Sequence, residues 1–126
     1  MLLDTHVFLW LQTEPERLGG SLRLIEDPAA DLLLSAASSW EIAIKHGLGR
    51  LPLPDPPDEY VPERIRFSGI IALPIEHSHA LAVSELPPLH RDPFDRMIVA
   101  QAMLLDVPII TADPAVMQYE IETIRV

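Results

Sequence analysis

The sequence predicts a single α/β domain whose central, mostly parallel sheet is covered by helices on both faces. Three observations support this prediction. Short apolar runs alternate with amphipathic stretches along the whole chain. A length of 126 residues is enough for one domain with a substantial core. Strands that are separated by helices pair in parallel. The chain has no internal repeat and no low-complexity tail, so we expect one domain over residues 1–126.

The apolar runs and the amphipathic stretches give the expected elements in chain order. The predicted strands are Met1–Leu3, Asp31–Ser35, Ile70–Pro74, Pro108–Thr111 and an edge strand near Ile121–Val126. The predicted helices are Thr5–Gln12, Ser21–Glu26, Ser39–His46, Asp58–Phe67, Glu76–Ser84 and Pro93–Leu105. The segment Leu51–Pro57 has four prolines in seven residues and is predicted to be a stiff surface loop.

The charge balance restricts how this protein can meet a polyanion. The chain has 19 acidic residues against 9 lysines and arginines, a net charge of -10. This balance argues against a protein that holds nucleic acid through a broad basic surface. To bind a polyanionic substrate, the protein would need a local source of positive charge, such as a divalent metal ion, a few arginines at the binding site or a basic partner protein. Because the chain has no cysteine, it has no disulfides, thiol nucleophiles or thiolate metal sites.

The apolar segments are too short to predict a membrane span. The best candidate, Met97–Ile110, is interrupted by Gln101 and Asp106 and is shorter than the roughly 18 residues that a spanning helix needs. The first residues carry the acid Asp4 where a signal peptide would carry positive charge. We therefore expect a soluble protein with a cytoplasmic location and no membrane partner.

Four acids follow predicted strands or open the helices after them. Asp4 closes the first strand, and Glu41 is expected in the first turn of the helix after the second strand. Asp95 opens the long helix, and Asp113 follows the fourth strand. In an open parallel sheet these positions face one crevice, where ligands usually bind. Carboxylates suit Mg²⁺ or Mn²⁺, and such an ion can polarise a phosphoryl oxygen and lower the pKa of water. The pattern therefore predicts a metal site for phosphodiester hydrolysis.

Each acid taken alone also has a structural interpretation. The segment Ser38–Glu41 fits a capping box, and Asp92 and Asp113 each precede a proline as a helix cap does. We assign Asp92 as a cap only. Asp4 resists this interpretation, because a charge in the apolar stretch Leu2–Phe8 is costly without a partner. The joint pattern therefore favours the metal site.

These residues resemble those of PIN-domain ribonucleases, and among them the VapC-type toxins of VapBC toxin-antitoxin systems. The resemblance covers essentially the whole chain and is carried by the fragments Leu3–His6, Ser39–Lys45, His90–Arg96, Ala100–Ala102 and Thr111–Asp113. It implies a three-layer α/β/α sandwich, RNA cleavage that depends on a divalent metal ion, frequent homodimers, and inhibition by an antitoxin whose tail enters the acidic crevice. The matched acidic positions are Asp4, Glu41, Asp95 and Asp113, with Thr5 and Thr111 as polar positions beside them.

Three cations and the histidines leave alternatives open. Lys45 lies four residues after Glu41, so it either pairs with Glu41 along the helix or contacts substrate phosphate. Arg91 and Arg96 flank Asp95 and either bind phosphate or form weak surface pairs. The five histidines do not form a convincing zinc set, and His77 and His79 are expected on a solvated helix face.

The resulting hypothesis is an endoribonuclease that uses Mg²⁺ or Mn²⁺ to hydrolyse RNA phosphodiester bonds. It would be the toxin of a type II pair, a homodimer inhibited by an antitoxin with a basic segment that suits the acidic charge. Two alternatives remain at this stage. One is a metal-dependent phosphatase on a similar α/β sheet, and the other is a non-catalytic module that binds a partner. Cleavage of RNA by pure protein would separate the enzyme from the module.

Overall fold

The computed structural model describes all 126 residues and contains a five-stranded sheet in which every pairing is parallel. The strands are β1 (Leu2–Leu3), β2 (Leu33–Ser35), β3 (Ile71–Leu73), β4 (Ile109–Thr111) and β5 (Thr123–Arg125). Their order across the sheet is β3-β2-β1-β4-β5. The chain therefore builds one half of the sheet outward from β1 and then returns to build the other half. This reversal leaves a topological switch point between β1 and β4.

Helices connect all of these strands. They are α1 (Thr5–Thr13), α2 (Leu22–Glu26), α3 (Ala36–Gly47), α4 (Pro57–Ser68), α5 (His77–Ala82), α6 (Pro93–Leu105) and α7 (Pro114–Met117). Two short 3₁₀ helices, Pro15–Ser21 and Val83–Glu85, complete the set. All five predicted strands and all six predicted helices are present. The four-residue α7 and the first 3₁₀ helix were not predicted. The proline-rich loop ends one residue earlier than expected, because Pro57 is the first residue of α4, where proline is favoured.

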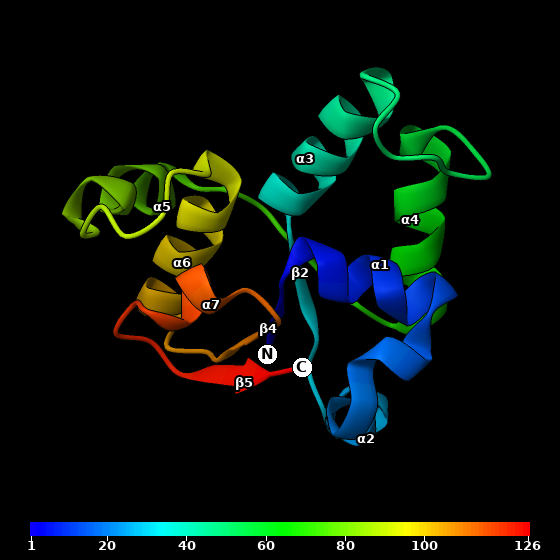
Figure 1. The fold of residues 1–126 in the computed structure, drawn as a ribbon, viewed down its shortest axis with the longest axis horizontal. Coiled ribbons are helices and arrows are strands. Elements are labelled where there is room, and N and C mark those ends of the chain that lie inside the picture. Colours follow the sequence, from blue (N-terminus) through cyan, green and yellow to red (C-terminus); the bar gives the residue numbers. More distant parts are fainter.

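The helices form two layers that cover the two faces of the sheet, so the predicted three-layer sandwich is confirmed. Figure 1 shows α1 and α4 on one side of the strands and α5, α6 and α7 on the other. Successive strand residues point to opposite faces. Leu3 and Ile110 accordingly pack with residues of α1 and α4, whereas Leu2 and Ile109 pack with residues of α6.

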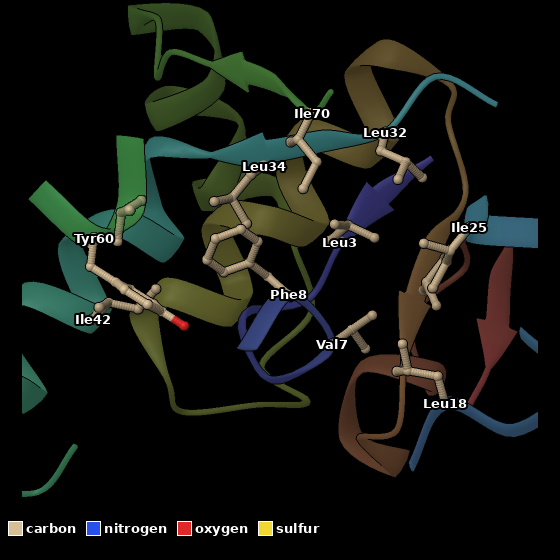
Figure 2. Close-up of a cluster of buried hydrophobic side chains, with 12 residues drawn as sticks. Leu3, Val7, Phe8, Leu18, Ile25, Leu32, Leu34, Ile42, Tyr60 and Ile70 are labelled. Atoms are coloured by element: carbon tan, nitrogen blue, oxygen red, sulfur yellow. The ribbon is translucent and has the colours of Figure 1, made fainter. Parts of the chain in front are cut away.

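The two apolar clusters hold the sheet rigidly between the layers. Figure 2 shows the cluster on the α1 side, where Phe8 lies among Leu3, Leu34 and Ile42. Phe8, Leu3 and Ile42 have no solvent-exposed surface. Burial of this kind is the main favourable term in folding. It also fixes the ends of β1 and β4, from which the acidic residues project. No helix in the structure has both the length and the apolar character that a membrane crossing requires.

Candidate active site

Four acids meet at the switch point, at the carboxyl ends of the central strands. Asp4 follows β1 and is the N-cap of α1, and Asp113 lies two residues after β4 and is the N-cap of α7. Asp95 is in the first turn of α6, whose N-cap is Asp92. Glu41 lies on α3, and its charge acts on Asp95 together with the charge of Asp4. The structure thus brings Asp4, Glu41, Asp95 and Asp113 together, and we call them the four site acids.

The position of Glu41 differs from the sequence prediction. We expected a capping box from Ser38 to Glu41, but α3 begins at Ala36 and its N-cap is Ser35, whose Oγ accepts a hydrogen bond from Ala37 N at 3.0 Å. Glu41 is therefore in the second turn and does not cap the helix. The early start follows from the fold, because Ser35 is also the last residue of β2. The carboxylate is consequently not used by its own helix end.

Asp4 is the most firmly held of the four site acids. Asp4 is buried, with 5% of its surface exposed. Its two carboxylate oxygens have different hydrogen-bond partners. Oδ1 accepts from Thr5 N at 2.7 Å, and Oδ2 accepts from the Thr111 hydroxyl at 2.6 Å. Burial raises the pKa of Asp4, and the hydrogen bonds from Thr111 and Thr5 oppose this rise. The strand end therefore fixes this carboxylate in one orientation.

Glu41 is buried with only one of its oxygens satisfied. Oε2 pairs with the Lys45 ammonium one helical turn later, whereas Oε1 has no hydrogen-bond partner. The residue is 3% exposed, so water does not reach Oε1 freely. The hydrogen bond with Glu41 is the main cause of a raised pKa at Lys45. A buried carboxylate oxygen without a donor is costly, and a bound cation would satisfy it.

Asp95 is a carboxyl group with a strongly raised pKa. Burial and then the charges of Asp4, Asp92 and Glu41 raise its pKa from 3.8 to about 7. Such a shift is expected when carboxylates share one site without a cation between them. Perturbed acids of this kind gather at functional sites. Asp92, in contrast, is the predicted cap: its Oδ1 accepts from Phe94 N at 2.8 Å and from Asp95 N at 3.2 Å.

His90 is a site residue that the sequence reasoning missed. Its Nε2 lies 2.9 Å from Asp95 Oδ2 and 3.0 Å from Asp113 Oδ2. Burial lowers the pKa of His90, but the hydrogen bond with Asp113 and the charge of Asp95 outweigh this effect, so the pKa is raised. These three residues offer ligand atoms that all lie within 4.8 Å of one another. The only signal in the sequence is the place of His90 at the head of the fragment that leads to Asp95.

The side chains expected to contact substrate fall into two groups. Three of them donate hydrogen bonds within the protein. Thr5 donates to the buried Ser38 hydroxyl at 2.8 Å, and Thr111 donates to Asp4. Arg96 donates to backbone carbonyls of the 83–87 segment. Arg91 is exposed, and the side chain of Lys45 is 40% exposed. Of the histidines expected on a solvated helix face, His79 is buried at 6% exposure and that part of the prediction is wrong.

Two hollows lie beside the four site acids. One has a volume of about 250 Å³. Its polar lining residues are Thr5, His6, Glu41, Lys45 and Arg50, and its apolar lining residues are Leu9, Ile42 and Leu51. The other has a volume of about 270 Å³ and is lined by Asp4, His6, Trp10, Ala112 and Asp113. The first hollow brings two permanent cations to an otherwise acidic region. The arrangement can therefore hold a cation on the carboxylates and an anionic group next to it.

Comparisons with known proteins give a family match and a related sequence. The chain from residue 1 to residue 121 matches the PIN domain. Ribonuclease VapC16 of Mycobacterium tuberculosis (strain ATCC 25618 / H37Rv) is 48% identical over 56 residues, a stretch that spans 44% of this chain and 40% of that protein. The matched stretch is thus less than half of the length of this curated relative.

Solved structures share the fold at low sequence identity. One is the crystal structure of VapBC2 from Rickettsia felis bound to a DNA fragment from their promoter. It contains a chain that is similar to this one, with a TM-score of 0.69 and 11% sequence identity. The match covers 98% of this chain and 96% of that chain. The crystal structure of FitAcB from Neisseria gonorrhoeae gives a TM-score of 0.63, 19% identity and coverage of 98% and 96%. Because the PIN domain accounts for nearly the whole length, this chain belongs to the PIN-domain family.

Proposed function

We propose that this chain is an endoribonuclease that hydrolyses RNA phosphodiester bonds with Mg²⁺ or Mn²⁺. The observation that supports it best is the convergence of the four site acids at the switch point of a PIN domain. The name of the relative Ribonuclease VapC16 supports the same reaction. The resemblance to VapC-type toxins further implies a cytoplasmic homodimer that a cognate antitoxin inhibits. The net charge of -10 supports an antitoxin whose contacting segment is basic.

The chemistry of the site fits a divalent cation. All four site acids offer carboxylate oxygens, which are the ligands that Mg²⁺ and Mn²⁺ prefer. Glu41 Oε1 is buried without a partner, and burial and the neighbouring acidic charges raise the pKa of Asp95 to about 7, so both groups would gain from a cation. A bound ion supplies charge stabilisation to the phosphate and lowers the pKa of water for attack on phosphorus.

The residues of the chain prepare this site before any ion or substrate arrives. Thr111 and Thr5 N hold Asp4 in one orientation, and Lys45 holds one oxygen of Glu41 so that Oε1 is left free. Preorganised groups cost no rearrangement at the moment of reaction. In this proposal Asp4, Glu41, Asp95 and Asp113 hold the ion, and Thr5 and Thr111 act on the substrate only through the acids that they support.

The substrate backbone would be held by the cations beside the acids. We place an RNA phosphate in the hollow that Lys45 and Arg50 line, because these residues are the local positive charge that an acidic protein needs for a polyanion. Arg91 is exposed and would offer a further positive charge to the RNA backbone. Arg96 is less suited to this role, since its guanidinium already donates to Pro87 O at 2.9 Å and to the Tyr119 hydroxyl at 3.1 Å.

The test is cleavage of RNA by the pure protein in Mg²⁺ or Mn²⁺ and in chelator, with Asp95→Asn beside the parent. Loss of one electrostatic group at the reacting charge costs about a hundredfold or more in rate, so we expect at least that loss. Glu59→Gln is a matched control, because Glu59 is the third residue of α4, which begins at Pro57, just as Asp95 is the third residue of α6, which begins at Pro93. Cleavage in chelator, or equal rates for the two variants, would reject the proposal.

A further inference from the structure

The His90 ring bridges two of the four site acids. Nε2 lies 2.9 Å from Asp95 Oδ2 and 3.0 Å from Asp113 Oδ2, and the side chain is 19% exposed. Asp95 comes from the first turn of α6 and Asp113 from the N-terminus of α7, so the ring joins two elements that are separate in sequence. By distance alone, His90 could be either a third metal ligand or a hydrogen-bond donor to both acids.

The second ring nitrogen decides between these two roles. The backbone N–H of Asp92 donates to His90 Nδ1 at 3.2 Å, so Nδ1 presents its lone pair and carries no proton. The proton of the neutral ring is then on Nε2, which faces the two carboxylates. A nitrogen that carries a proton has no lone pair for a metal ion. His90 Nε2–H therefore donates to Asp113 Oδ2 at 3.0 Å and lies 2.9 Å from Asp95 Oδ2, where it faces a carboxylate and not a metal ion.

We infer that His90 is a positioning residue: through one shared Nε2–H it holds the Asp95 and Asp113 carboxylates as a pair for a divalent cation, without being a ligand itself. The inference rests on the proposed metal site. A carboxylate has about four lone-pair positions, so the oxygens that accept from His90 keep capacity for an ion. Partners that orient ligands in this way typically change metal affinity by about 10–100-fold when they are removed.

The backbone around His90 is anchored independently of its ring. His90 N donates to the Tyr119 hydroxyl at 3.0 Å, and the Arg96 guanidinium also donates to that hydroxyl, at 3.1 Å. Arg96 further donates to Pro87 O at 2.9 Å, which ties the preceding loop to α6. A change of the His90 side chain therefore removes the bridge between the acids and the hydrogen bond from Asp92 N, while the bond from His90 N to Tyr119 still holds the backbone at residue 90.

The first experiment measures Mg²⁺ and Mn²⁺ affinity by titration calorimetry on the parent, His90→Leu and His90→Gln. We expect His90→Leu to bind about 10–100-fold more weakly, and His90→Gln to keep most of the affinity because its amide N–H can donate to the same carboxylates. His77→Leu, at an exposed position of α5, is the matched control. Thermal melts in chelator check that each variant is folded, and His90→Gln keeps the test valid if His90→Leu is not.

The second experiment reads the proton position by ¹⁵N NMR of the histidine rings across a pH series, on the high-pH plateau where the ring is neutral, because the neighbouring acids raise the pKa of His90. We expect His90 to carry its proton on Nε2 both in chelator and with Mg²⁺. A proton on Nδ1, or equal metal affinity in the parent and His90→Leu, would overturn the inference and leave the metal site itself intact. Absence of metal binding by the parent would overturn the proposed function and, with it, any role of His90 towards an ion.

Discussion

Asp4 and Asp113 differ from Glu41 and Asp95 in what each carboxylate does for the fold. Asp4 Oδ1 accepts from Thr5 N at 2.7 Å and Asp113 Oδ1 accepts from Ala115 N at 2.9 Å, so both acids cap helices at strand ends. Glu41 and Asp95 cap nothing, and Glu41 Oε1 has no partner. The capping acids therefore support the fold, and in the proposed site they would also hold the ion. In the proposed site the helix-borne acids would hold the ion without capping a helix, and burial together with neighbouring charges raises the pKa of Asp95 to about 7.

The largest expected effect on stability comes from a capping acid. Asp4→Ala removes the cap of α1 and leaves the buried Thr111 hydroxyl without its acceptor. Loss of a cap costs about 1 kcal/mol, and a buried unsatisfied polar group costs about 1–3 kcal/mol. We expect the free energy of unfolding in chelator to fall by about 2 kcal/mol or more. Denaturant titration measures this change.

The control for that prediction is Asp4→Asn, which keeps an oxygen for the cap and removes the charge. It should be clearly more stable than Asp4→Ala in chelator, while both should lose metal-dependent cleavage. If Asp4→Ala and Asp4→Asn unfold at the same denaturant concentration, Asp4 has no capping role and the distinction between the two kinds of acid fails.

The convergence of the acids was predictable because topology dictates it. Apolar runs separated by amphipathic stretches predict a parallel sheet, and in such a sheet strand ends and helix starts share one edge. Asp4, Asp95 and Asp113 occupy such positions in the sequence itself. The cap assignment of Asp92 was also predictable, since an acid before a proline is a local signal that needs no tertiary contact.

The features that were mispredicted depend on tertiary contacts or on competing local signals. Ser35, Ser38 and Ser39 can each cap a helix, and only the end of β2 at Ser35 selects the first of them. His79 was assigned to solvent, but α5 packs against α6, and its Nδ1 lies 3.2 Å from Gln101 Nε2. His90 reaches Asp113 across 23 positions of sequence. No periodicity within one element could reveal such a contact.

The next effect is a pH dependence of stability to which Asp95 should contribute strongly, because its pKa is raised to about 7. The pKa of Asp95 is about 7 in the folded chain against 3.8 as its ordinary value. Between these values the folded protein binds a proton that the unfolded chain has released, so the free energy of unfolding falls as pH rises from about 4 to about 7. In chelator we expect the melting temperature to drop by a few degrees over this range. Saturating Mg²⁺ should reduce the drop, because the ion binds the charged form.

Asp95→Asn isolates this contribution from the raised pKa values of Asp4 and His90, which have the same sign. The variant should show a shallower pH slope than the parent and should melt higher than the parent at pH 8 in chelator. If the melting temperatures of the two proteins change with pH by the same amount, the pKa of Asp95 is not raised in the folded protein. The contrast between Asp95 and the capping acids would then have no electrostatic basis.

The smallest effect concerns Asp92, which caps α6 in the way that Asp4 caps α1 but is not one of the four site acids. Its Oδ1 accepts from Phe94 N at 2.8 Å and Asp95 N at 3.2 Å, so Asp92→Ala should cost about 1 kcal/mol of stability. Asp92→Asn should cost less, because asparagine caps helices nearly as well.

Metal-dependent cleavage should stay within a few fold of the parent in both variants, since Asp92 only adds to the negative field around Asp95. Denaturant titration and initial cleavage rates measure the two effects on the same preparations. Loss of cleavage in Asp92→Asn with unchanged stability would make Asp92 a fifth acid of the site. Asp92 would then take part in cleavage as well as cap α6.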